Sequence, residues 1–214
     1  MTTNEKLLEY AKDGKYEKLI ECLNENIREE VVAKNWSGRG RLPKSDSIIK
    51  RMMKKIPDYE NKFRVNHPAV IDGMEYNCFL DGHRIFMDSE MDYGYPKVDK
   101  ETKFDVTKFV NLDLYRYKKV EVNRNELDIF IKTHKNEGIP YVIKINEQYI
   151  GMNPNFLKDM LDFTETDFIY VELGDSEIVK TPFYSINKDK TKVVMTLPMI
   201  FNSTTYSNVN QEVA

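Results

Sequence analysis

The residue types that most often carry out catalysis or bind metals are few and scattered in this sequence. The three histidines, His67, His83 and His134, do not stand at metal-ligand spacings from one another or from Cys22 and Cys78. The chain also has no glycine-rich phosphate-binding loop and no Ser or Cys nucleophile motif. These observations predict a protein that is not an enzyme and that needs no metal or cofactor.

One acidic run has a spacing that could bind calcium. Asp88, Glu90 and Asp92 alternate along the chain, and Asp99 stands at the twelfth position of such a loop. A calcium loop needs Gly at its sixth position, where this chain has Tyr93, and it usually has a bidentate Glu at its twelfth position. We therefore expect no calcium site here.

The strongest cluster of binding-type residues is basic. The chain has 32 Lys and Arg against 35 Asp and Glu, a net charge of −3, but residues 35–64 contain nine basic and three acidic residues. The local charge of +6 attracts phosphates at short range, because salt screens distant charges within about 10 Å. The segment 36–41 contains the only Trp and the glycine-spaced Arg39 and Arg41, and such a loop can wrap a phosphate backbone. A solvated helix face is the alternative explanation of the charge.

Two helical segments flank this loop. Residues 4–34 repeat apolar side chains every three or four positions, which predicts a helix that Gly14 divides into two pieces. Residues 45–56 predict a second helix with Ser45 as its N-cap. The apolar residues of the second helix share one face, and the opposite face carries Lys50, Arg51, Lys54 and Lys55.

Beyond about residue 65 the pattern changes to short β-prone runs separated by turns. The pattern predicts helices at 124–135 and 154–161, and strands at 69–71, 76–80, 84–87, near 104–106 and 109–117, and at 120–122, 141–145, 148–152, 168–173, 178–184 and 192–197. This order predicts an α+β fold with helices on one face of meandering sheets. The expected organisation is an N-terminal helical segment (1–34), a basic glycine-containing linker (35–44), an α+β domain (45–201) and a polar tail (202–214).

The composition narrows the class of protein further. Apolar residues make up 41% and aromatic residues 12%, which is enough for a core. No apolar run approaches the roughly 18 residues of a membrane span, and the N-terminus has no signal-peptide h-region. Two cysteines form no disulfide framework, so we expect free thiols and a cytoplasmic protein that does not bind membranes.

Two pairs of segments resemble one protein family. Residues 67–76 (HPAVIDGMEY) and 78–86 (CFLDGHRIF) are similar to a strand and the following Asp-Gly-His-Arg hairpin of the bacterial DNA sliding clamp, the DNA polymerase III beta subunit. Residues 149–161 (YIGMNPNFLKDML) and 193–201 (VVMTLPMIF) resemble the strand-helix segment and the closing strand of the same family. The resemblance covers roughly residues 45–201 in scattered pieces.

The resemblance implies a fold, partners and candidate site residues. Clamp domains consist of repeated strand-helix-strand-strand-strand halves, and six domains form a ring that encircles duplex DNA and tethers a polymerase without reading sequence. The DNA-facing residues would be Arg39, Arg41, Lys50, Arg51, Lys54, Lys55, Lys132, Lys135 and Lys158. The groove that binds peptides of polymerases and other replication proteins would correspond to Met195, Leu197 and Met199.

The sequence is compatible with several alternatives. The chain has room for one clamp domain, and its size favours a phage or mobile-element origin. Three helices are expected where one domain has two, so residues 118–146 are either an insertion or part of a misaligned half. A one-domain chain could form a ring as a homo-oligomer of six copies, or it could be a monomeric protein-interaction module that does not encircle DNA. A small nuclease or hydrolase would require a cluster of acids that the sequence does not identify.

Overall fold

The computed structural model describes residues 3–36, 42–56, 64–98, 104–135, 137–201 and 209–213. Its helices are α1 (Thr3–Lys12), α2 (Tyr16–Asn35), α3 (Lys44–Lys55), the 3₁₀ helix η2 (Val106–Lys108), α4 (Arg124–Thr133) and α5 (Pro154–Thr164). Its strands are β1 (Ala69–Ile71), β2 (Met74–Leu80), β3 (Arg84–Asp88), β4 (Tyr117–Glu121), β5 (Tyr141–Ile145), β6 (Gln148–Met152), β7 (Phe168–Glu172), β8 (Phe183–Ile186), β9 (Lys192–Thr196) and β10 (Gln211–Val213). This mixture confirms the predicted α+β class.

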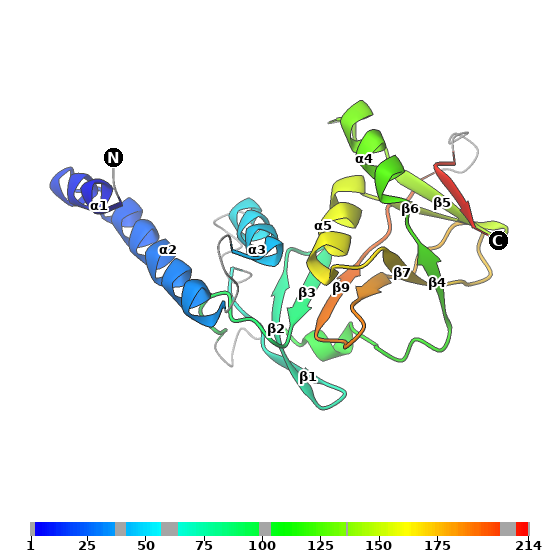
Figure 1. The fold of residues 1–214 in the computed structure, drawn as a ribbon, viewed down its shortest axis with the longest axis horizontal. Coiled ribbons are helices and arrows are strands. Elements are labelled where there is room, and N and C mark those ends of the chain that lie inside the picture. Colours follow the sequence, from blue (N-terminus) through cyan, green and yellow to red (C-terminus); the bar gives the residue numbers. More distant parts are fainter. Residues whose placement is uncertain are drawn as a thin grey trace.

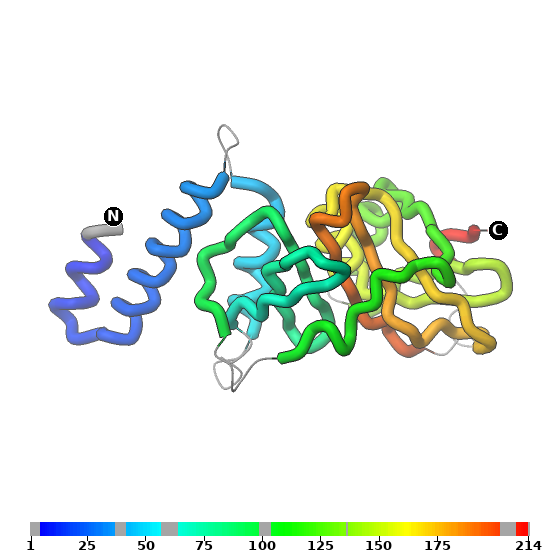
Figure 2. Tube along the Cα trace, turned by 90° about the horizontal axis from the view of Figure 1, so that it is seen from below, coloured from blue at the N-terminus to red at the C-terminus, as the bar shows by residue number. Residues whose placement is uncertain are grey.

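The N-terminal helices form a hairpin that projects from the rest of the molecule (Figure 1). The chain turns at Gly14, whose φ of +67° lies in the left-handed region that favours glycine, and this confirms the predicted break. The C-terminal end of α2 reaches the body, where Val32 is fully buried and Trp36 packs against the main core. The hairpin end, with α1, lies away from the sheets (Figure 2).

Most of the described strands belong to one antiparallel sheet with the order β1-β2-β3-β9-β8-β7-β4. At its centre β3 pairs with β9, so that Arg84 lies opposite Thr196 and Asp88 lies opposite Lys192. This pairing brings the first and last parts of the α+β domain together. A smaller sheet has the order β10-β5-β6, in which β10 runs parallel to β5.

The helices α3, α5 and α4 lie in a row on one face of the large sheet, with α5 packed against both neighbours (Figure 1). Side chains alternate across a strand, so the buried residues of β3 divide between two clusters. Phe86 joins the main core beneath the helices, whereas Ile85 and Met87 join a second cluster on the other face. Residues 104–114 cover that second cluster with Val106, Val110 and Leu112.

The region between β3 and β4 corrects two strand predictions. Residues 104–106 and 109–116 contain no strand and instead form η2 and irregular chain. Asp105 favours the helical turn because its carboxylate accepts a hydrogen bond from the Thr107 N–H at 3.2 Å. The β-prone side chains bury themselves against the face of the sheet rather than by pairing at its edge, and β-propensity does not distinguish these two outcomes.

Smaller differences appear at three other places. Pro43, not Ser45, occupies the N-cap of α3, and Ser45 is buried in the first turn. The predicted strand at 178–184 begins only at Phe183, and Ile178 instead forms an isolated bridge with Tyr149 of β6. The predicted polar tail contains β10, in which Gln211 lies opposite Ile143 of β5. Polar side chains are compatible with β10 at the edge of the small sheet, because its pairing with β5 uses backbone hydrogen bonds.

The repetition of strand-helix-strand-strand-strand halves is not shown by the described residues. One run, β6-α5-β7-β8-β9, has this order. The segment α3-β1-β2-β3 has no described leading strand, and β4-α4-β5-β6 has only two strands after its helix. The third helix, α4, packs beside α5 as part of the same helical layer.

Candidate nucleic-acid interface

Helix α3 has the two faces that its sequence predicts. Its apolar residues are buried in the main core, where Ile49 is 0% exposed and Met52 is 1% exposed. The basic residues lie on the other side, where Lys50 is half-buried and Arg51, Lys54 and Lys55 are exposed. Packing therefore fixes the helix so that its cations face outward.

Lys50 is paired with acids of α2. Its Nζ donates to Glu29 at 2.9 Å and also to Glu25. Burial alone would raise the pKa of Glu25, but the hydrogen bond from Lys50 and the charge of Arg28 lower it below its usual value. A phosphate that approached Lys50 would have to compete with these two carboxylates.

Arg51 belongs to an ion-pair network that crosses the helical layer. Its guanidinium contacts Asp159 of α5. The other oxygen of Asp159 accepts from Arg84 at 3.0 Å, and Arg84 also donates to Asp81 in the turn between β2 and β3. Arg51 remains half exposed, at 50%, so its outer donors still face solvent.

Lys54 and Lys55 differ from these two cations. Both are exposed at the C-terminal end of α3, and neither forms an ion pair with any residue in the described ranges. Binding of a phosphate here would not require an internal ion pair to break. Arg39 and Arg41, the other predicted contributors from this region, lie outside the described residues.

The neighbouring helices add little net positive charge. Lys158 of α5 binds Asp128 of α4 at 2.6 Å, and this hydrogen bond lowers the pKa of the Asp128 carboxyl. Lys132 of α4 and Lys135 just beyond it are exposed and form no ion pair among the described residues. Besides Lys158, α5 carries Asp159 and Asp162. The structure therefore concentrates the positive charge on α3.

The predicted peptide groove has only one well-exposed member. Met195 is 5% exposed because it packs in the second cluster, and Met199 is half-buried and bridges to Gly151. Leu197 is 42% exposed, and its N–H donates to the His83 carbonyl. Sequence reasoning missed Ile200, which is 85% exposed beside them in the chain.

The acidic run after β3 has a structural role. The Asp88 carboxylate accepts hydrogen bonds from the N–H groups of Glu90 and Met91 and, at 2.7 Å, from the Tyr93 hydroxyl. Burial raises the pKa of Asp88, and these three donors offset part of that effect. The backbone therefore uses the oxygens that a calcium ion would need. Asp99 lies outside the described residues.

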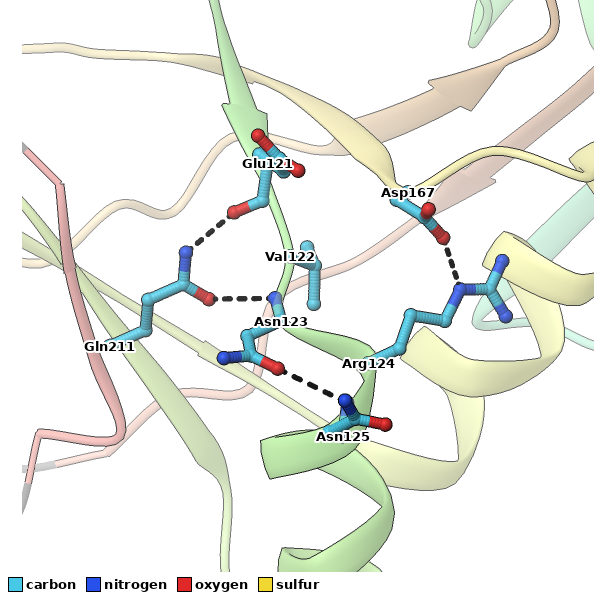
Figure 3. A pocket seen from close by; sticks show the side chains of 7 residues that line it. All are labelled: Glu121, Val122, Asn123, Arg124, Asn125, Asp167 and Gln211. Atoms are coloured by element: carbon cyan, nitrogen blue, oxygen red, sulfur yellow. Dashed lines mark hydrogen bonds and ion pairs between the residues drawn. The ribbon is translucent and has the colours of Figure 1, made fainter.

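A pocket of about 370 Å³ lies where β4 meets α4 (Figure 3). Gln211 of β10 spans it, because its side chain donates to the Glu121 carbonyl at 2.5 Å and accepts from the Asn123 N–H at 3.3 Å. Arg124 binds Asp167 and, at 2.5 Å, Asp162. These contacts hold β10 and α4 in place, and the pocket offers no group poised for chemistry.

Two features are absent from the part of the chain that the structure describes. No group of three or more His, Cys, Asp and Glu side chains there is arranged to hold a metal ion. No helix there is long and apolar enough to span a membrane.

This arrangement, a sheet with helices α3, α5 and α4 on one face, resembles the fold of solved sliding-clamp structures. One similar structure is described as a DNA polymerase III beta subunit from Eubacterium rectale ATCC 33656, with a TM-score of 0.53 and 16% identity over 78% of this chain. Another is the DnaN sliding clamp from Bartonella birtlesii bound to griselimycin, with a TM-score of 0.51 and 12% identity over 73% of this chain.

The similarity is one of fold alone, and it spans about two thirds of each clamp chain. The matched regions cover 67% and 65% of the Eubacterium and Bartonella chains. No protein-family model matches the sequence, and no curated protein matches it. The mixed α+β clamp-like fold predicted from the scattered motifs is confirmed at this level.

Proposed function

We propose that this protein is a non-catalytic, clamp-like replication protein that binds duplex DNA without sequence preference through the outer face of α3. The observation that carries the proposal is the pair of exposed lysines Lys54 and Lys55, which form no ion pair among the described residues and lie on the helical layer of a clamp-like fold. Arg51 adds a half-exposed guanidinium on the same helix.

The charge of the helical layer supports this assignment. Helix α3 carries Lys44, Lys50, Arg51, Lys54 and Lys55 against the single acid Asp46, which is buried and bound to Arg28 at 2.6 Å. Phosphate attraction acts within about a Debye length of ~8–10 Å, so this local excess is effective although the chain is acidic overall. If two to four phosphates are neutralised, the slope of log K against log salt should be about −2 to −4.

Fluorescence anisotropy of a labelled duplex, measured with the full chain at several salt concentrations, tests the proposal. Replacing Lys54 and Lys55 with Glu should reduce affinity at least about tenfold and flatten the salt dependence. Replacing Lys180 and Lys188 with Glu changes the net charge equally at exposed positions outside the helical layer. Equal losses in the two double variants, or wild-type binding that does not depend on salt, would contradict the proposal.

A second candidate is a monomeric protein-interaction module of phage or mobile-element origin that has a clamp fold but does not encircle DNA. The exposed apolar pair Leu197 and Ile200 favours it, because such side chains can receive a peptide of a polymerase or another replication protein. Titration of a labelled polymerase C-terminal peptide tests this candidate. Leu197→Glu should abolish binding, whereas Ile129→Glu, at a 63% exposed position of α4, should not.

A further inference from the structure

The projecting hairpin carries an apolar stripe that the clamp-like body leaves uncovered. Tyr16, Ile20, Leu23 and Ile27 of α2 are 66%, 56%, 42% and 57% exposed. They follow one another at intervals of four, three and four residues, so at 3.6 residues per turn they fall within a stripe about 60° wide. Single exposed apolar side chains are common on protein surfaces, but four large ones aligned on one helix face indicate a contact surface.

The stripe is distinct from the faces of α2 that already have partners. Arg28 and Val32 are buried where α2 meets the body, and Glu25 and Glu29 bind Lys50. Viewed down the helix axis, these four residues point about 110° to 170° away from the centre of the stripe. The stripe is therefore not part of the attachment of α2 to α3.

The positions beside the stripe are nearly free of charge. Leu19, Asn24 and Asn26 flank it, and Glu17 is the single charged residue among the flanking positions between 16 and 27. The charged residues Lys18 and Glu21 lie on other sides of the helix. A partner helix with an uncharged apolar face would fit this surface better than a strongly acidic or basic one, because Glu17 is the one charge beside the stripe between residues 16 and 27.

We propose that the stripe binds the same stripe of a second copy of this chain, with the two α2 helices antiparallel about a two-fold axis. The spacing of four, three and four reads the same in both directions, so the surface is complementary to itself. The axis would pass between Ile20 and Leu23, placing Ile20 of one copy against Leu23 of the other and Tyr16 against Ile27. Each large side chain then meets an apolar partner, as an isologous interface requires.

The area sets the expected strength of this dimer. The four side chains leave on the order of 400 Å² exposed per copy, within the range of the largest apolar patches on monomers. Two such patches and their rims reach only the lower end of specific interfaces, about 1,200 Å² in total. The dimer should therefore be reversible, with a dissociation constant in the micromolar range.

Sedimentation velocity of the full chain, from low micromolar to several hundred micromolar, tests the proposal. We expect a concentration-dependent monomer–dimer equilibrium that Leu23→Glu weakens at least about tenfold. Lys18→Glu, on the far side of α2, should leave the equilibrium unchanged. Circular dichroism and Trp36 emission of Leu23→Glu should match the wild type, because Leu23 is not part of the core. A wild type that stays monomeric, or a dimer that Leu23→Glu does not weaken, would overturn the proposal.

Disulfide crosslinking tests the antiparallel register separately. In a Cys22→Ser background, chains with Ile20→Cys mixed with chains with Leu23→Cys should crosslink faster than either variant alone. A parallel arrangement would instead crosslink Ile20→Cys chains to one another, and that result would refute the two-fold antiparallel geometry.

Discussion

Arg84 connects the sheet to the helical layer, and its removal should destabilise the fold strongly. The side chain is 2% exposed at the start of β3. Its guanidinium donates to Asp81 at 2.6 Å and to Asp159 at 3.0 Å, and it lies 3.9 Å from the centre of the Phe156 ring. Asp159 extends the network to Arg51 of α3.

The size of the effect follows from what Arg84→Ala leaves behind. Asp81 and Asp159, only 13% and 17% exposed, would lose their shared cation, although Asp159 would keep Arg51. Removing one partner of a buried ion pair typically costs about 3–5 kcal/mol, and loss of the ring contact belongs to the same order. A typical domain has only about 5–15 kcal/mol of stability, so Arg84→Ala should lose a large part of it.

Urea unfolding followed by circular dichroism and by emission of the single Trp36 measures this loss. We expect the free energy of unfolding to fall by about 3–5 kcal/mol and Tm by roughly 6–20 °C. Arg84→Lys keeps one charge but cannot bridge both acids, so its loss should be intermediate. Lys54→Ala, at an exposed position, should change stability by less than about 0.5 kcal/mol. A loss below about 1 kcal/mol for Arg84→Ala, with an unchanged m-value, would refute this account of the network.

Two further perturbations follow from the same core. The pKa of Asp88 is raised in the fold. The protonated carboxyl therefore contributes its full share of the folding stability below the unfolded pKa of about 4, and this contribution is lost as pH rises through the folded pKa. Asp88→Asn should therefore gain stability relative to the wild type as pH rises from 4 to neutrality in urea unfolding, and a pH-independent difference would count against this. Gly94→Ala places a Cβ 2.8 Å from the Arg28 Cα, so it should cost at least about 2 kcal/mol more than Gly138→Ala, where φ is also positive but no atom lies within 4 Å.

Local signals in the sequence were sufficient where the structure depends on neighbouring residues. Asn153 accepts hydrogen bonds from the N–H groups of Asn155 and Phe156, and Pro154 starts α5 at the first residue of the predicted helix 154–161. The strands at 141–145 and 148–152 have the predicted bounds, because a turn at Asn146, with φ of +53°, sets their register. Each of these features involves side chains within a few positions of one another.

Sequence reasoning failed where distant segments decide the outcome. The pairing of β3 with β9 and the burial of Met195 depend on contacts across most of the domain. The acids that bind Lys50 and Arg51 come from α2 and α5, so no local pattern could show that these cations are partly neutralised. The sequence predicts that the basic residues share one face of α3, but it does not predict which of them are paired with acids.

The position of α2 determines which cations of the basic helix are paired with its carboxylates. Glu25 and Glu29 lie beside Lys50 near the middle of α3, whereas Lys54 and Lys55 lie one turn further along, toward the C-terminal end. The carboxylates of α2 would repel a polyanion that approached Lys50. Among the described residues, neither of these carboxylates is paired with Lys54 or Lys55. Attachment of the hairpin through Arg28 and Asp46 thus places the acids Glu25 and Glu29 beside Lys50, and it leaves Lys54 and Lys55 one helical turn beyond Lys50.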